Sequence, residues 1–355
     1  MHLKRTLSVL AIAAVATMAQ TIDDRDYTGA ELYTRQTWMY GKFEARMKMA
    51  AGSGTVSSMF LYHNDSYLGA PEPWVEVDIE ILGKDPGKFQ SNIITGYGPG
   101  ENTKIQSADP SHVISPASNE SFHTYAMEWT PNYVSWSIDG REVRRTVNGQ
   151  NDKNQVEDLK KREQGLRFNL WSHEDAGWVG PWSDAILPVY QFINWVKVYN
   201  YTPGEGPNGS DFTLEWADNF DDFNTARWLK GNWTFDKNRV YISSKNIYPK
   251  DGMVILALTK KGEESFNGQV PQDAAGDAEF TNGTQQQSSS SEQFNQSSSS
   301  QETNLFGSSS SSTEPTGILQ NRAKLQNKEI RGTVNAKGVR VNPNNKANYQ
   351  VDFNF

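Results

Sequence analysis

The chain has 355 residues, of which 36% are hydrophobic and 12% aromatic, enough for one large domain with a sizeable core or for two small ones. Its formal net charge of −8 argues against nucleic acid or an anionic membrane as the partner, since both would repel it, and favours a neutral partner. The chain has no cysteine, so an exported form would be stabilised by packing, with or without a bound ion, and not by disulfides.

The first 19 residues have the pattern of a secretory signal peptide. Basic residues Lys4 and Arg5 precede an apolar run from Leu7 to Val15, and cleavage is expected after Ala19. The alternative, a membrane anchor, is disfavoured because the run is too short to span a bilayer, and no later segment could span one. We therefore expect a secreted protein, outside the cell or at its surface.

Residues 20–271 are expected to form one all-β domain, because their hydrophobic pattern has the period of two that is typical of half-buried strands. In residues 41–50, charged residues alternate with four apolar ones, Phe43, Ala45, Met47 and Met49. Two turn signals divide residues 122–146 into three strand-like runs, a meander. Further strands are expected at 54–64, 89–98, 166–171, 192–202, 233–243 and 252–259, and a single weak helix at 154–164. Many short strands of this kind predict a sandwich or a barrel.

The composition changes after Pro271. Serine runs at 288–291, 297–300 and 308–312 cannot bury enough apolar surface to fold, so residues 272–316 are expected to be a disordered linker. Residues 317–355 are rich in Lys and Arg. This basic segment has three open interpretations: a sorting signal, an attachment module, or a solvated tail.

The stretch "PWVEVDIEILG" places three carboxylates, Glu76, Asp78 and Glu80, at every second position. Residues of a strand alternate between faces, so the three share one face while the intervening Val and Ile residues point into the core. Like charges along one face repel, so stability alone would not select this arrangement. It is compatible with a solvated strand face, with a cation site, or with paired-carboxylate catalysis on a sugar.

Geometry favours catalysis. Cα atoms four residues apart on a strand are separated by roughly 13 Å, and on a curved sheet two Glu side chains leaning together could bring their carboxyl groups to about 5 Å, as retaining glycoside hydrolysis requires. Asp78 between them would help to set which carboxyl holds the proton. Other strands alternate aromatic residues with Asn, Gln and Arg, a composition suited to sugar rings, although aromatic residues in strands more often belong to a core.

At these residues the sequence resembles glycoside hydrolase family 16, the β-jelly-roll, concanavalin A-like endo-glucanases, and within it the lichenases, which are 1,3-1,4-β-glucanases. "WVEVDIEILGK" resembles the family's Glu-x-Asp-x-Glu strand without the inserted residue that laminarinases usually carry, and "LRFNLW" resembles a later family segment. The resemblance implies that Glu76 is the nucleophile, Asp78 its modulator and Glu80 the general acid/base.

Residues 212–259 depart from the usual order. They resemble the segment that ordinarily opens the family's sequence, yet here they follow the last strand, joined to it by "PGEGPNGS". The chain thus resembles a circularly permuted bacterial lichenase over roughly residues 27–271, a form that also carries a Ser-rich linker and a basic terminal segment. Permutation is tolerated because domain termini often lie close together.

The resemblance also implies binding residues and a structural, non-catalytic calcium ion. The calcium would lie on the convex face, bound through Asn194, Asn219 and the carbonyl of Gly252, which are oxygen ligands of the kind calcium prefers. The implied residues of the glucan cleft are Phe60, Tyr62, Asn64, Trp74, Gln90, Asn92, Arg167, Asn169, Trp171, Trp178 and Trp233.

Taken together, these features predict a secreted bacterial endo-β-glucanase that acts as a monomer on mixed-linkage β-glucan such as lichenan or cereal β-glucan. It would cleave a β-1,4 bond that follows a β-1,3 bond, with net retention. A laminarinase or another family 16 glycanase is the rival enzyme, and a non-catalytic glucan-binding module is the rival from another class.

Overall fold

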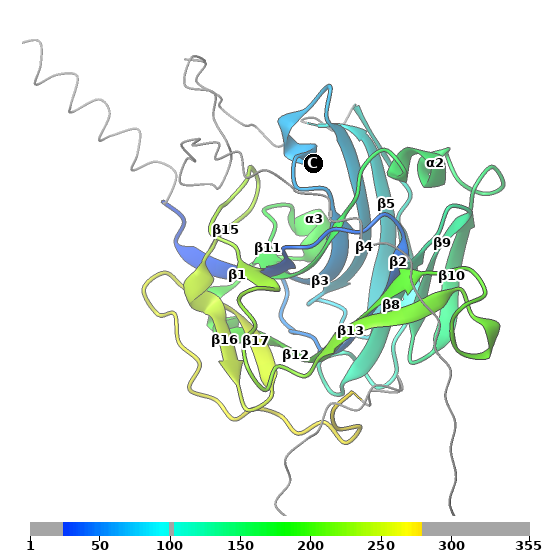
Figure 1. Cartoon of the computed structure of the whole chain (residues 1–355). Helices are drawn as coiled ribbons and strands as arrows, with labels where there is room; N and C mark the ends of the chain where they lie inside the picture. The colour runs from blue at the N-terminus through cyan, green and yellow to red at the C-terminus, as the bar shows by residue number, and fades with distance from the viewer. Residues whose placement is uncertain (1–23, 99–102, 279–355) are drawn as a thin grey trace, which may run out of the picture. The chain divides into compact units, whose positions relative to one another are not determined.

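The computed structural model describes residues 24–98 and 103–278 (Figure 1). The predicted signal peptide, the basic segment and all but the first residues of the predicted linker lie outside these ranges. Two sheets, sheet I and sheet II, pack face to face. Within the described ranges, no helix has the length and apolar character needed to cross a membrane.

Sheet I carries the carboxylate strand near its middle. Its strands follow one another in the order β14 (Trp228–Lys230), β1 (Tyr27–Thr34), β11 (Gly165–Ser172), β3 (Thr55–Tyr62), β4 (Pro73–Leu82) and β5 (Lys88–Tyr97), with β6 (Lys104–Gln106) and β7 (Asp109–Val113) on the far edge of β5. All these pairings are antiparallel, so residues directly opposite each other share a face.

Sheet II runs through β10 (Arg141–Val147), β9 (Tyr133–Ile138), β8 (His123–Trp129), β2 (Gly41–Lys48) and β12 (Val189–Tyr201). The other edge of β12 pairs first with β17 (Met253–Lys260), which carries β16 (Ile247–Lys250), and then with β13 (Phe212–Asp218). The change of partner leaves a gap between β17 and β13 beside Asn194, where the register of β12 against β2 also shifts.

The core lies between the sheets and consists of the inward residues of both. Phe43, Ala45 and Met47 are fully buried and Met49 nearly so, as the alternation predicts. On β4 the inward residues are Val77, Ile79 and Ile81, which have no exposed surface. The predicted all-β sandwich is therefore confirmed.

The expected elements differ from the structure at residues 233–243 and at the helix, and the expected strands also leave out β1, β6, β7, β13, β14 and β16. Residues 233–243 form only one short strand, β15 (Val240–Ile242), and not a single long one. The segment folds back on itself, since Trp233 pairs with Ile242 through an isolated antiparallel bridge. The predicted helix shortens to α2 (Gln155–Leu159), which begins after Asn154 in the left-handed conformation. The expected strands omit β1, since Gly29 and Ala30 weaken its β pattern.

The first and last strands of the sandwich are neighbours. Tyr27 at the start of β1 pairs with Lys260 at the end of β17, and the backbone N–H of Lys261 donates to the carbonyl of Asp26. The same part of β1 also pairs in parallel with β15. The two ends of residues 26–261 thus meet at one edge (Figure 1).

Candidate active site

The three carboxylates share the outer face of β4, opposite to its core-facing Val and Ile residues. Cross-strand pairing extends this face to both sides: Tyr62 and Phe60 of β3 lie opposite Glu76 and Asp78. On β5, Asn92 and Gln90 lie opposite Asp78 and Glu80. The predicted polar and aromatic residues of β3 and β5 therefore surround the carboxylates.

The same face continues from β3 onto β11. Arg167 lies opposite Phe60, and Asn169 lies opposite Ser58, which itself faces Glu80 across β4. Arg167 also donates to the side-chain oxygen of Asn64, which follows β3. A cavity of about 450 Å³ opens on the other side of Asn64, lined also by His63 and Arg162 and by none of the three carboxylates of β4.

Each glutamate is held by one neutral donor. The indole N–H of Trp74 donates to Glu76 Oε2 at 2.6 Å, and the amide of Gln90 donates to Glu80 Oε2 at 2.6 Å. Gln90 in turn accepts from the indole N–H of Trp178 at 3.3 Å. These bonds fix the orientation of both carboxyl groups, while no cation lies within salt-bridge distance of either in the described residues.

Burial raises the pKa of all three acids. For Glu80, burial followed by the nearby charge of Glu76 outweighs the Gln90 hydrogen bond and raises the pKa to about 7. Burial also raises the pKa of Glu76, although the Trp74 hydrogen bond and the charge of Lys104 oppose it. Ionisation is also unfavourable for Asp78: burial and the charges of Glu76 and Glu80 raise its pKa well above the usual range. Burial and mutual repulsion therefore favour the protonated forms of Glu80 and Asp78.

Aromatic side chains border the carboxylates, and they differ in how far they are covered. Trp74 packs edge-on against Tyr62, with ring centroids 5.5 Å apart. Trp178, on the short helix α3 (Ala176–Val179), and Trp233 are partly buried. Trp171 has the predicted orientation on β11 but is only 6% exposed, because Trp178 and Phe235 pack against it.

Sequence analysis missed two residues of β1 on this face. Glu31 lies opposite Asn169 and Tyr33 opposite Arg167, and the Glu31 carboxylate forms a buried ion pair with the Arg167 guanidinium. The Arg167 guanidinium also lies 4.6 Å from the centre of the Tyr33 ring. The signal in the sequence is a single acidic residue between Ala30 and Leu32, both fully buried.

Residues predicted to bind calcium converge at the gap beside β12. Asn194 lies at the register shift of β12, Asn219 directly follows β13, and Gly252 occupies the two-residue Asp-Gly turn between β16 and β17. A Cβ atom at Gly252 would lie 3.9 Å from the carbonyl oxygen of Asn219. The three residues thus lie on sheet II, away from the carboxylates, with Gly252 beside the carbonyl of Asn219. No cluster of three acidic, His or Cys side chains occurs in residues 24–98 and 103–278.

Comparison with known proteins identifies the family of the chain. The sequence profile of "Glycosyl hydrolases family 16" matches residues 6–184. A "Beta-glucanase" of Fibrobacter succinogenes is 55% identical over 357 residues, which is 99% of each chain, and one of Brevibacillus brevis is 35% identical over 186 residues, covering 52% of this chain and 64% of its own. The solved Bacillus licheniformis β-glucanase is 30% identical, covers 46% of this chain and 68% of its own, and superposes with a TM-score of 0.38. On the family match and the full-length relative, the chain belongs to glycosyl hydrolase family 16.

Proposed function

We propose that this family 16 enzyme is a secreted β-glucanase that cleaves β-1,4 bonds following β-1,3 bonds in mixed-linkage glucan, with net retention. The observation that carries the proposal is the pair Glu76 and Glu80, held on one face by neutral donors with Asp78 between them. The full-length similarity to a protein named "Beta-glucanase" supports the substrate class.

In the first step, an ionised Glu76 oxygen attacks the anomeric carbon while Glu80 transfers its proton to the departing glycosidic oxygen. The bond from the sugar to the leaving group breaks as the bond to Glu76 forms. The pKa of about 7 keeps Glu80 protonated at mildly acidic pH, as a general acid requires. Trp74 steadies the attacking carboxylate through its N–H.

In the second step, Glu80 is ionised and removes a proton from water, which attacks the anomeric carbon and displaces Glu76. Two inversions give net retention. Asp78, whose burial favours its neutral form, can donate a hydrogen bond to Glu76 and so make it a better leaving group in this step.

A neutral polysaccharide suits the remainder of the face. Tyr62, Trp178 and Trp233 offer flat apolar surfaces, and Asn92, Arg167 and Asn169 supply polar groups for hydroxyls. The mechanism needs one chain only, which supports a monomer acting on glucan without nucleic acid or membrane partners.

Calcium would act as a structural ion far from the reaction. Asn194, Asn219 and Gly252 would hold it at the gap between β13 and β17, and it would supply a positive charge that joins the two strand ends. The carboxylate face lies on the other sheet, so the ion would contribute to stability and not to bond cleavage.

Circular permutation remains part of the proposal. Two observations support it: β1 and β17 bring the ends of residues 26–261 together, and residues 203–210 form a short connection between β12 and β13. The proposed division is a signal peptide at 1–19, the permuted catalytic domain at 20–271, a linker at 272–316 and a basic segment at 317–355.

The product profile tests the function. We expect hydrolysis of lichenan, with little activity on laminarin or carboxymethyl-cellulose, and a first product whose new reducing end is β by NMR. Preferred cleavage of laminarin would favour the laminarinase alternative. Binding to lichenan without any release of reducing sugar would favour the non-catalytic module.

A further inference from the structure

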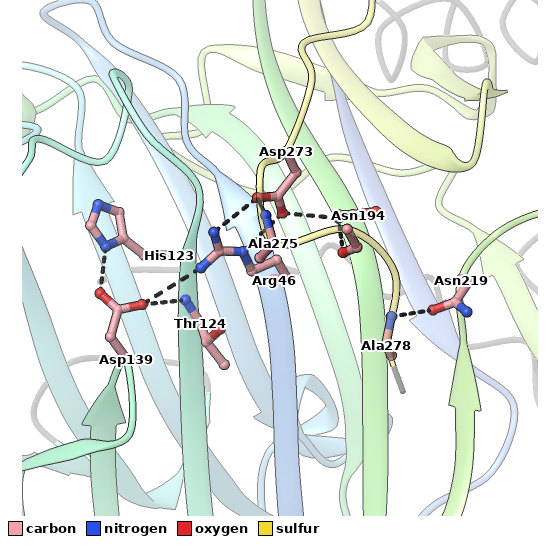
Figure 2. Close-up of polar contacts among 10 residues, drawn as sticks. Arg46, His123, Thr124, Asp139, Asn194, Asn219, Asp273, Ala275 and Ala278 are labelled. Carbon is pink, nitrogen blue, oxygen red and sulfur yellow. Dashed lines mark hydrogen bonds and ion pairs between the residues drawn. The ribbon is translucent and has the colours of Figure 1, made fainter. Parts of the chain in front are cut away.

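Residues 272–278, here named the strap, follow the predicted catalytic domain and contact the outer face of sheet II (Figure 2). The strap turns back on itself at Asp273, whose carbonyl accepts from the N–H of Gly276 and whose side chain accepts from the N–H of Ala275. It begins where the predicted linker begins, so its contacts were not expected from composition.

Asp273 anchors the strap to β2. Its two carboxylate oxygens accept hydrogen bonds of 2.8 and 2.9 Å from the guanidinium of Arg46, and its side chain is only 3% exposed. Arg46 lies on the outer face of β2, between the core residues Ala45 and Met47. A bidentate, largely buried pair of this kind is geometrically specific.

The strap also fixes the side-chain amide of Asn194. The nitrogen of that amide donates to Asp273 Oδ2 at 2.9 Å and to the carbonyl of Gly276 at 3.0 Å. Both partners are acceptors, which identifies this end of the amide as nitrogen. With both hydrogens engaged, Asn194 Oδ1 is left as the group directed away from the strap, and no described residue donates to it.

Asn219 is held in a similar way. Its side-chain oxygen accepts from the N–H of Ala278 at 3.0 Å (Figure 2). The backbone carbonyl of Asn219, which lies beside Gly252, is thereby the oxygen that remains for an ion. The strap therefore contacts two of the three residues predicted to bind calcium.

Asp273 could instead be read as a calcium ligand itself, or the strap as a tail that merely rests on the sheet. The first reading fails because both carboxylate oxygens are already engaged by Arg46. The second does not explain why the strap's polar contacts fall on Asn194, in β12, and on Asn219, directly after β13.

We propose that Asp273 is a positioning residue for the calcium site, orienting Asn194 so that its amide oxygen faces the ion. The strap then belongs to the folded catalytic unit, which ends at residue 278 and not at residue 271 as the composition suggests. This inference rests on the calcium site proposed above and is independent of the substrate. Partners that orient a ligand side chain in this way typically change metal affinity by about 10- to 100-fold when they are removed.

The test uses the full-length chain with Asp273→Ala, and Asp277→Ala as a matched control. Asp277 lies in the same strap, is exposed, and carries the same charge. Calcium affinity is measured by calorimetry, and the calcium-dependent rise in melting temperature by comparison with chelator. We expect Asp273→Ala to weaken calcium binding about 10- to 100-fold and to reduce the rise in melting temperature, and Asp277→Ala to leave both unchanged.

Asp273→Asn separates positioning from charge. Its side-chain oxygen can still accept from Asn194, so we expect most of the calcium affinity to return although the ion pair with Arg46 is weakened. Equal losses in Asp273→Asn and Asp273→Ala would overturn the positioning role, as would wild-type affinity in Asp273→Ala. A wild-type protein without any calcium response would overturn both the site and this inference, while hydrolysis of lichenan, measured separately, would still stand.

Discussion

The outer faces of the two sheets treat carboxylates in opposite ways. On sheet I, Glu76 and Glu80 each accept a hydrogen bond from a neutral N–H donor, and Oδ2 of Asp78 between them is buried without a hydrogen-bond partner among the described residues. On sheet II, Asp273 pairs with Arg46, and Asp139 hydrogen-bonds to His123 at 2.7 Å and lies 3.7 Å from Arg46. Both faces are built from alternating strands, so the strand pattern alone does not separate them.

The pKa values diverge accordingly. Burial raises the pKa of each of the three carboxylates on β4. Burial also acts to raise the pKa of Asp139 and Asp273, but the hydrogen bonds from His123 and Arg46 more than compensate and lower both values. Carboxylates without an ion-pair partner, as on β4, give up stability and gain the ability to exchange protons, whereas the ion-paired carboxylates of sheet II gain stability only.

The largest expected effect is on Glu76. Glu76→Ala should lower turnover by more than about 10⁴-fold, because no covalent intermediate can form. With an activated fluoride substrate and added azide, it should produce the α-glycosyl azide, since azide then attacks the open face directly.

The matching change on the acid/base is Glu80→Ala. Here Glu76 still forms the glycosyl-enzyme, so azide should give the β product. The products are identified by NMR. The β azide from Glu76→Ala and the α azide from Glu80→Ala would show that Glu80 is the nucleophile and Glu76 the acid/base. A wild-type product of inverted configuration would rule out double displacement.

A smaller effect is expected from Glu80→Gln, about 10²- to 10⁴-fold in turnover of polymer. In the wild type, activity should fall as the pH rises through about 7, because Glu80 then loses the proton that it gives to the leaving oxygen. With an activated aryl glucoside that needs no acid, Glu80→Gln should lose this alkaline limb. If the fall in activity at alkaline pH persists in Glu80→Gln, it reports the titration of another group.

The smallest effect compares one substitution on both faces, Asp78→Asn and Asp139→Asn. The raised pKa of Asp78 means that its stabilising contribution is complete below the unfolded pKa of about 3.9 and is lost as the pH rises towards the folded value. Asp78→Asn should therefore raise the melting temperature at pH 8 relative to the wild type, with a smaller difference at pH 4, while impairing activity.

Asp139 should behave in the opposite way. Its lowered pKa means that it stabilises the fold above the unfolded pKa and loses this contribution as the pH falls through the folded value. Asp139→Asn should lower the melting temperature at pH 8, by a small amount because the side chain is half exposed. Shifts of the same sign in both variants, measured by thermal denaturation, would contradict the contrast between the faces.

Much of the fold could be predicted because strand alternation is a local signal. Residues 41–50 and 122–146 gave β2, β8, β9 and β10 directly, and "WVEVDIEILG" gave the faces of β4. Short strands such as β6, β14 and β16 carry too few residues to show a period. They form because a neighbouring strand supplies their hydrogen bonds, and the sequence alone does not show which segment that neighbour is.

The site followed the same rule. Alternation along β3, β5 and β11 placed Tyr62, Gln90 and Asn169 each on one face of its own strand, and the family resemblance assigned them to the cleft. The register between the strands then brings them beside the carboxylates. Glu31 was missed because its partner, Arg167, lies 136 residues later in the chain. Whether Trp171 is cleft or core could not be read from its strand either, since Trp178 and Phe235 cover it from separate segments.

The meeting of β1 and β17 has a mechanical consequence. The two strands are antiparallel, and Tyr27 and Lys260 form the last pair, at the point where the chain enters and leaves the sandwich. A force pulling residues 26 and 261 apart would act across this pair, perpendicular to the strands. The inter-strand hydrogen bonds would therefore break one after another from this end, and would not bear the load all at once. Resistance would then depend on Thr28, whose hydroxyl lies 2.9 Å from that of Thr259 and which also accepts from the buried amide of Asn246. Under tension this corner would yield first, while β4, in the middle of sheet I, would remain paired on both sides.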